Sequence, residues 1–110
     1  MITVKRGETL RKVAIVRDVV TQKPIDLTGQ TITCYVRQPN GKLVVMATVT
    51  ILDQSVDTGK VLIDFGNTID WPMQTLNFDV RRVYQDGTFT TVQIDKTQTI
   101  KVERSITYDQ

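Results

Sequence analysis

Residues 31–51 read TITCYVRQPNGKLVVMATVTI, a stretch that carries the signals of a β-hairpin. Apolar and polar residues alternate over 31–38, and a period of two is typical of a strand buried on one face. The turn PNGK at 39–42 follows, and Asn and Gly tolerate the positive φ angles that tight hairpin turns need. Residues 43–51 return as a second strand. The expected apolar face of this hairpin comprises Ile32, Cys34, Val36, Leu43, Val45, Ala47, Val49 and Ile51.

The same alternation recurs on both sides of the hairpin. Further strands are expected at 2–5, 9–18, 60–65, 76–84, 88–94 and 98–103. Polar segments containing Gly or Pro connect them at 19–30, 53–59 and 86–87. Outside the hairpin, the residues expected to face the core are Ile25, Leu27, Val61, Ile63, Phe65, Leu76, Phe78, Val80 and Tyr84. In 9–18, Leu10, Ala14 and Val16 form one face and Val13 and Ile15 the other, and both sides are expected to be partly covered.

Two short segments are less regular. Residues 67–72 are expected to form a single helical turn, capped by Asn67 or Thr68 and ended by Pro72. Residues 95–97 are expected to form a tight turn or a bulge within one long strand.

Composition also favours strands over helices. The chain contains 15 Val, 10 Ile and 17 Thr, together 42 of its 110 residues, against only 2 Ala, 6 Leu and 2 Glu. β-Branched residues suit a pleated, half-buried surface, whereas Ala, Leu and Glu are strong helix formers. We therefore expect an all-β fold, an antiparallel β-sandwich or barrel of about seven or eight strands. It forms one domain over 1–103, and 104–110 is a polar tail expected to fray.

The charge balance and the residue inventory restrict the chemistry. Lys and Arg number 14 and Asp and Glu number 12, which gives a net charge of +2, and there is no His and only one Cys. The usual general base and the commonest metal ligand are therefore missing. A single Cys excludes an internal disulfide, and we expect synthesis in a reducing cytoplasm. No apolar run approaches the length of about 20 residues that spans a bilayer, so neither a membrane nor a secretory route is expected.

Several separate motifs together resemble one known family. They are Gly7-Glu8-Thr9, the stretch Pro24-Ile25-Asp26-Leu27-Thr28-Gly29 before an alternating strand, Arg37 to Gly41, Gly59-Lys60-Val61, Trp71-Pro72, Phe78-Asp79-Val80-Arg81, Asp86-Gly87-Thr88 and Ile100-Lys101-Val102-Glu103. This pattern resembles the immunoglobulin-like domain of tailed-phage baseplate proteins. That family is best known from the N-terminal module of the baseplate upper protein of lactococcal phages.

The resemblance implies a function as well as a fold. The fold would be an immunoglobulin-like β-sandwich. The chain would be a structural part of a phage or prophage virion, made in the bacterial cytoplasm and binding other tail or baseplate proteins. No catalytic residue and no cofactor come with the resemblance.

Candidate chemical sites compete with simpler structural interpretations. The run Asp53-x-Ser55-x-Asp57-x-Gly59 weakly resembles a calcium loop, but it lacks the bidentate Glu of an EF-hand, and an ordinary polar turn is favoured. Asp64 and Asp79 are carboxylates that a glycosidase would need as a pair, but both alternate outward on their strands. Cys34 lies on a core face and is interpreted as a small apolar residue. The sequence therefore predicts no enzyme.

Four residues are candidates for a contact surface: Trp71, Tyr35, Arg37 and Arg81. Trp71 is interpreted either as an exposed anchor or as a plug at one end of the core, and the same alternatives hold for Tyr35 and Phe89. Arg17, Arg37, Arg81 and Arg82 do not predict a nucleic-acid site, because acidic residues are interspersed and consecutive Arg81 and Arg82 point to opposite faces.

Self-association is expected through the terminal strands 2–5 and 98–103, because an exposed sheet edge can be continued by another chain. The alternative function is a carbohydrate- or cell-surface-binding module, which predicts exposed aromatic residues such as Trp71, Tyr35 or Tyr84.

Overall fold

A computed structural model describes residues 1–18, 20–92, 94 and 98–104, and within these ranges the fold is all-β, with strands and no helix. Because no described segment is helical, none could span a membrane as a helix. The strands are β1 (Ile2–Lys5), β2 (Thr9–Ile15), β3 (Thr31–Arg37), β4 (Leu43–Ile51), β5 (Lys60–Asn67), β6 (Thr75–Val83), β7 (Phe89–Val92) and β8 (Thr99–Glu103).

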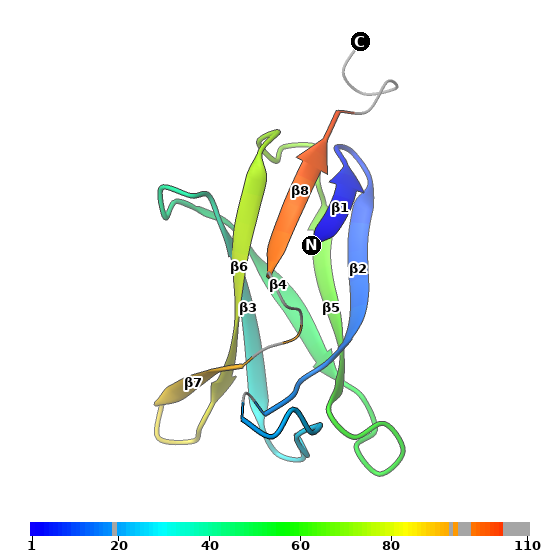
Figure 1. The fold of residues 1–110 in the computed structure, drawn as a ribbon, viewed down its shortest axis with the longest axis vertical. Helices are drawn as coiled ribbons and strands as arrows, with labels where there is room; N and C mark the ends of the chain where they lie inside the picture. Colours follow the sequence, from blue (N-terminus) through cyan, green and yellow to red (C-terminus); the bar gives the residue numbers. More distant parts are fainter. Residues whose placement is uncertain (19, 93, 95–97, 105–110) are drawn as a thin grey trace.

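The strands form one hydrogen-bonded path in the order β1-β8-β6-β3-β4-β5-β2, and β7 pairs with β6 beside that path. Strand β4 joins two layers, because its residues 43–47 pair with β3 and its residues 48–51 pair with β5. The path curls at this strand until its two ends, β1 and β2, lie next to each other (Figure 1). The result is nearly a barrel that encloses one core.

The expectation of a purely antiparallel arrangement is wrong at one pair. Strands β1 and β8 run parallel, with Ile2 opposite Ile100 and Val4 opposite Val102, whereas the other described strand pairs are antiparallel. A hairpin turn forces its two strands to be antiparallel, but almost the whole domain separates β1 from β8 along the chain. Their relative direction was therefore not visible in local turn signals.

The core follows the alternation in the sequence. Every second residue is buried in β3, over residues 61–65 of β5 and over residues 76–80 of β6. The Phe65 and Phe78 rings pack edge to face across the two layers, with centroids 6.1 Å apart. Leu27 is buried in the loop before β3, as expected. Leu43 and Tyr84 were expected to face the core but are exposed, because each lies at the end of a hairpin, beyond the opposite layer. The buried apolar residues are Ile2, Val4, Leu10, Val16, Leu27, Ile32, Cys34, Val36, Ala47, Val61, Ile63, Phe65, Trp71, Leu76, Phe78, Val80, Val92, Ile100 and Val102.

The two predicted hairpin turns are present. In the first, the Gln38 N–H donates to the Lys42 carbonyl and Gly41 has a φ of 89°. In the second, the Tyr84 N–H donates to the Thr88 carbonyl and Gly87 has a φ of 88°. Glycine adopts this left-handed conformation without the steric penalty that other residues pay, which explains why both turns could be predicted from the sequence.

The helical turn expected at 67–72 is absent. The N–H of Trp71 donates to the Thr68 carbonyl, which closes one tight turn only. Thr68 is fully buried, and its hydroxyl donates to the Glu8 carbonyl at 2.7 Å and accepts from the Gly7 N–H at 3.0 Å. These bonds to a turn some 60 residues earlier hold the segment in place. The Asn67 side chain does accept from the Ile69 N–H, as the capping signal predicts, but no helical turn follows it.

The last strands differ from expectation in one respect that matters for function. The segment 98–103 was expected to be an exposed edge, but β8 has β1 on one side and β6 on the other. Strands β7 and β8 both pair with the same side of β6, β7 at Val80–Val83 and β8 at Thr75–Asn77. The expected turn or bulge at 95–97 lies outside the described residues, as do residues 105–110 of the polar tail.

Candidate functional site

The outward face of β3, β6 and β7 gathers three of the four candidate contact residues. Strand β6 lies between β3 and β7, and their register places Arg81 opposite Thr33 on one side and Thr91 on the other. Odd-numbered residues of β6 point outward there, because Phe78 and Val80 point into the core. The register therefore brings Tyr35, Arg37, Arg81 and Phe89 to one face, which we call the aromatic–arginine surface.

Its side chains are stacked on one another. The guanidinium carbon of Arg81 lies 5.4 Å from the ring centroid of Tyr35 and 4.4 Å from that of Phe89. The guanidinium carbon of Arg37 also lies over the Tyr35 ring, 5.7 Å from its centroid, and the Arg37 guanidinium donates a hydrogen bond to the Gly41 carbonyl. Cations within about 6 Å of an aromatic face are attracted to it, so these contacts fix the arginine side chains in place.

Arg81 has hydrogen-bonding capacity that the described residues do not use. Its Nε atom is buried and has no hydrogen-bond partner among the described residues, and the same is true of the Thr33 hydroxyl directly opposite. Within that part of the chain, neither Arg81 nor Arg37 forms an ion pair with a carboxylate. Within the described residues, the Arg81 and Arg37 side chains are therefore held by their ring contacts and not by ion pairs.

Apolar side chains extend this surface on two sides. Phe89 is 53% exposed on β7, and Met46, directly opposite Tyr35 on β4, is 59% exposed. Met46 was not among the candidate contact residues, because it lies on the face of its strand that was expected to be solvated. Tyr35 and Met46 are neighbours only because of the register of the β3–β4 hairpin.

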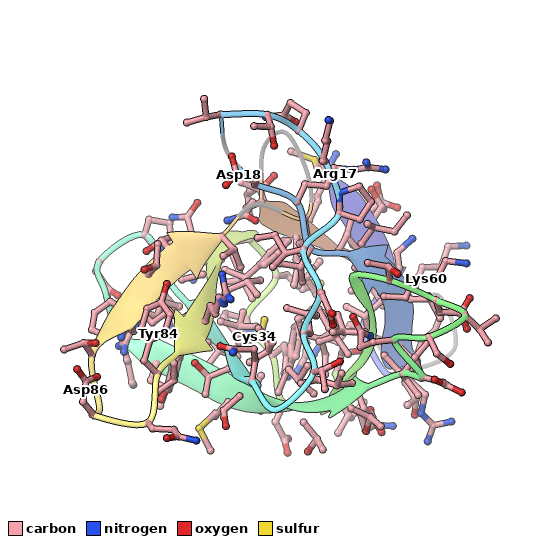
Figure 2. All side chains as sticks on the ribbon, turned by 90° about the horizontal axis from the view of Figure 1, so that it is seen from below. Arg17, Asp18, Cys34, Lys60, Tyr84 and Asp86 are labelled. Carbon is pink, nitrogen blue, oxygen red and sulfur yellow. The ribbon has the colours of Figure 1, made fainter. Side chains whose placement is uncertain are left out.

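Arg82 points to the other side of the sheet, as expected for the residue after Arg81. Its guanidinium lies 5.4 Å from the Tyr84 ring centroid, and its Nε donates to the Gln30 side chain at 3.1 Å. Tyr84 and Asp86 lie at the tip of the β6–β7 hairpin, away from the enclosed core (Figure 2). The four arginines considered as a basic patch therefore do not form one continuous stripe.

Trp71 does not belong to the contact surface. Only 5% of it is exposed, and it packs in the core cluster beside the turn at 67–72. Of the two interpretations of this residue, the plug agrees with the structure and the exposed anchor does not. Burial of the large Trp ring is strongly favourable. The position of Trp71 in the sequence does not by itself show whether the ring is buried.

The acidic candidates for metal binding or catalysis serve local structure. Asp53 accepts hydrogen bonds from the backbone and hydroxyl of Ser55, and Asp57 pairs with Lys60. Asp64 pairs with Arg11 on the outside of β5, whereas Asp79 lies on the outside of β6, in the other layer. The structure therefore does not bring Asp64 and Asp79 together. No cluster of potential metal ligands occurs among the residues that the structure describes.

Four aspartates share one turn motif. Asp26, Asp53 and Asp86 accept hydrogen bonds from the hydroxyl and backbone of the Ser or Thr two residues later. Asp18 accepts from the backbone of Val20 and Thr21. These hydrogen bonds favour the carboxylate and lower the pKa of each group below 3.8. Their contribution to stability is therefore present above that pH and is lost as the pH falls below it.

Cys34 is the one thiol, and it lies between the two layers (Figure 2). Burial raises its pKa from 9.0 to about 12, and the negative charge of Asp79 adds to the shift. Its contribution to stability is intact at neutral pH and is lost as the pH rises from 9.0 toward 12.

We expect this thiol to be inert in the native protein. The thiolate is the reactive form, and the raised pKa leaves very little of it at pH 8 in the native protein compared with the unfolded chain. Labelling with a chromogenic disulfide reagent is therefore expected to be at least about 100-fold slower in buffer than in guanidinium chloride. Equal rates in the two conditions would place Cys34 at the surface.

Comparison of the chain with protein-family models gives no match. Comparison with the curated proteins gives none either. Fold and geometry therefore define the class of protein without help from relatives: an all-β domain, nearly barrel-shaped, with an ordered aromatic–arginine surface on β3, β6 and β7.

Proposed function

We propose that this chain is a structural protein of a phage or prophage virion, a non-catalytic immunoglobulin-like domain that binds other tail or baseplate proteins and associates with itself. The observation that carries the binding role is the aromatic–arginine surface. It is outward-facing, ordered by its own stacking and rich in Tyr and Arg, the residue types that concentrate binding energy in protein interfaces.

The strand order supports the immunoglobulin-like part of the proposal. In immunoglobulin constant-type domains the second and fifth strands pair in one sheet, and the third, sixth and last strands pair in the other. Here β2 pairs with β5, and β3, β6 and β8 are neighbours in the other layer. Strand β4, which crosses between the layers, makes the path continuous.

The segment with the strongest family resemblance has a structural role that supports the same fold. Pro24 forms a bridge with Arg17, Leu27 is fully buried, and Gly29 has a φ of 72° at the turn before β3. Leu27 is thus required for the core, and Gly29 for the left-handed backbone conformation of the turn.

The chemistry of the surface indicates the kind of partner. Arg37 and Arg81 are only half-buried and form no ion pair with a carboxylate among the described residues, Asp79 on the same face included. A partner that offers Asp or Glu side chains would form charge-assisted hydrogen bonds with these two groups. We therefore propose an acidic protein surface as the partner.

The same contacts argue against the carbohydrate-binding alternative at this surface. Sugar rings stack on open aromatic faces, but guanidinium groups already lie over the rings of Tyr35 and Phe89, so that only part of each ring is open. Tyr84 is partly exposed, yet Arg82 lies over its ring. A screen against glycans is expected to give no ligand, and a glycan that protects Tyr35 would favour the alternative.

The proposed role is tested by the composition of the particle. Phage particles or induced prophage particles from a strain that carries this gene are purified on a density gradient, and their proteins are identified by mass spectrometry. We expect the chain in the particle fraction at a copy number similar to that of tail proteins. Its absence from particles, with the protein present in the cell extract, would contradict the proposal.

A charge reversal tests the surface itself. Arg81→Glu is expected to weaken incorporation into particles, or binding to the purified tail partner, by about tenfold or more, because loss of an interface hot-spot residue costs about 2 kcal/mol or more and each 1.4 kcal/mol is about tenfold in affinity. Lys23→Glu makes the same change of charge in a loop away from this surface and is expected to bind normally. Equal binding by both variants would exclude the aromatic–arginine surface as the contact.

A further inference from the structure

Three strands of the described part have an open edge: β1 and β2 at the ends of the path, and β7 beside β6. The first two carry basic residues, Lys5 on β1 and Arg11 and Lys12 on β2. Charged residues on edge strands, Lys above all, are a common protection against unwanted pairing. Strand β7 reads FTTV and has no charge, although three of its four residues are exposed.

The backbone of β7 has free groups in a defined pattern. The Tyr84 N–H donates to the Thr88 carbonyl and the Tyr84 carbonyl accepts from the Gly87 N–H, so the turn ends in a bulge, and the next pair of the ladder, Arg82 with Thr90, is the hydrogen-bonded one. In an antiparallel ladder such pairs alternate with pairs that are not hydrogen-bonded. The register of β6 with β7 therefore directs the backbone of Thr90 and Val92 toward β6, and that of Phe89 and Thr91 toward the open side.

We propose that β7 is a self-pairing edge, at which a second copy of this chain adds its own β7 in antiparallel orientation. With the two-fold axis at Thr90, Phe89 of each copy lies opposite Thr91 of the other. The outward N–H and C=O groups of both residues are then hydrogen-bonded across the interface. The sheet β3-β6-β7 of one copy continues into the equivalent sheet of the second.

A second copy fits this edge better than it fits the other two. Self-pairing of β7 places only Phe and Thr side chains across the axis, whereas self-pairing of β2 about its centre would bring Arg11 and Lys12 of both copies together. Strand β1 carries Lys5, a charge of the kind that protects an edge from pairing. Phe89, which is 53% exposed, lies on the face that Thr91 shares with Arg81. Pairing therefore covers part of this ring and joins the two aromatic–arginine surfaces into one.

The inference rests on the proposed function for its biological meaning, because it specifies how the chain would associate with itself. The interface is small, so we expect a dissociation constant of about 10 μM to 1 mM. Sedimentation equilibrium over this concentration range measures it directly. The wild-type chain is expected to change from monomer to dimer as concentration rises.

Two substitutions at Thr91 test the edge. Thr91→Pro removes an outward N–H without removing a bond to β6, and Thr91→Lys places a charge on each side of the axis. Each is expected to raise the dissociation constant at least tenfold while the circular-dichroism spectrum stays that of the wild type. Thr3→Lys, the same change on the β1 edge, is the matched control and should dimerise normally.

Two results would overturn the inference. The first is a wild-type chain that stays monomeric at about 1 mM, the upper end of the dissociation constant expected for so small an interface. The second is a dimer that Thr3→Lys disrupts and the Thr91 variants do not. A monomeric chain that is nevertheless found in particles would overturn the self-pairing edge and leave the proposed function standing. A dimer that the Thr91 substitutions disrupt, in a chain that is absent from particles, would support the self-pairing edge and overturn the proposed function.

Discussion

Replacing Phe65 by alanine is expected to lower the free energy of unfolding by about 3–5 kcal/mol, the usual cost of removing a buried aromatic ring. Phe65 is 2% exposed, and its ring packs on Phe78 from the other layer. The substitution therefore removes a contact between the layers and leaves a cavity. Since domains of this size are stable by about 5–15 kcal/mol, much of the total would be lost.

Urea unfolding followed by the fluorescence of Trp71, the single and buried tryptophan, measures this loss. Phe65→Leu, which keeps most of the apolar volume, is expected to cost less than about 2 kcal/mol. Phe89→Ala removes an exposed ring and serves as the surface control. A loss under about 1 kcal/mol for Phe65→Ala would mean that the two layers do not share this core.

Replacing Gln54 by alanine is expected to have the second largest effect, a loss of about 2–4 kcal/mol, because buried backbone groups would lose their partners. The Gln54 Oε1 atom accepts from the N–H groups of Leu27 and Gly59, at 3.0 and 2.8 Å. Its Nε2 donates to the Leu52 carbonyl at 2.9 Å. One side chain thus ties the loop 53–59 to the loop before β3.

The measurement is again urea unfolding, and Val56→Ala is the control in the same loop. Val56 is 78% exposed, so its truncation should change stability by less than about 0.5 kcal/mol. If Gln54→Ala and Val56→Ala cost the same, the hydrogen bonds of Gln54 do not hold the two loops together.

Local patterns in the sequence predicted most of the fold. Alternation identified the inward residues of β3, β5 and β6, and the Asn40-Gly41 and Asp86-Gly87 turns fixed two hairpins. Both features depend on residues that are close in the chain. Where contacts span the whole domain the prediction failed, as for the parallel β1–β8 pair and for residues 67–72, which Thr68 ties to the turn at Gly7 and Glu8.

The contact surface was only partly predictable for the same reason. Tyr35, Arg37 and Arg81 were each recognisable as interface residue types, but their gathering on one face depends on the register of β3 with β6. Met46 enters through the register of β3 with β4. Burial of Trp71 and the open edge of β7 follow from how the layers close, which no local pattern encodes.

The central claim is that this domain works by contact through the outward face of β3, β6 and β7. Hydroxyl-radical footprinting tests it most directly, since it reports the solvent accessibility of individual Met and aromatic side chains. The free chain and the chain within purified particles are compared. Met46, Tyr35 and Phe89 are expected to be oxidised several-fold more slowly in the particle, whereas Met73, which is exposed in the segment between β5 and β6, keeps its rate. Unchanged oxidation of Met46, Tyr35 and Phe89 together with protection of Met73 would contradict the claim.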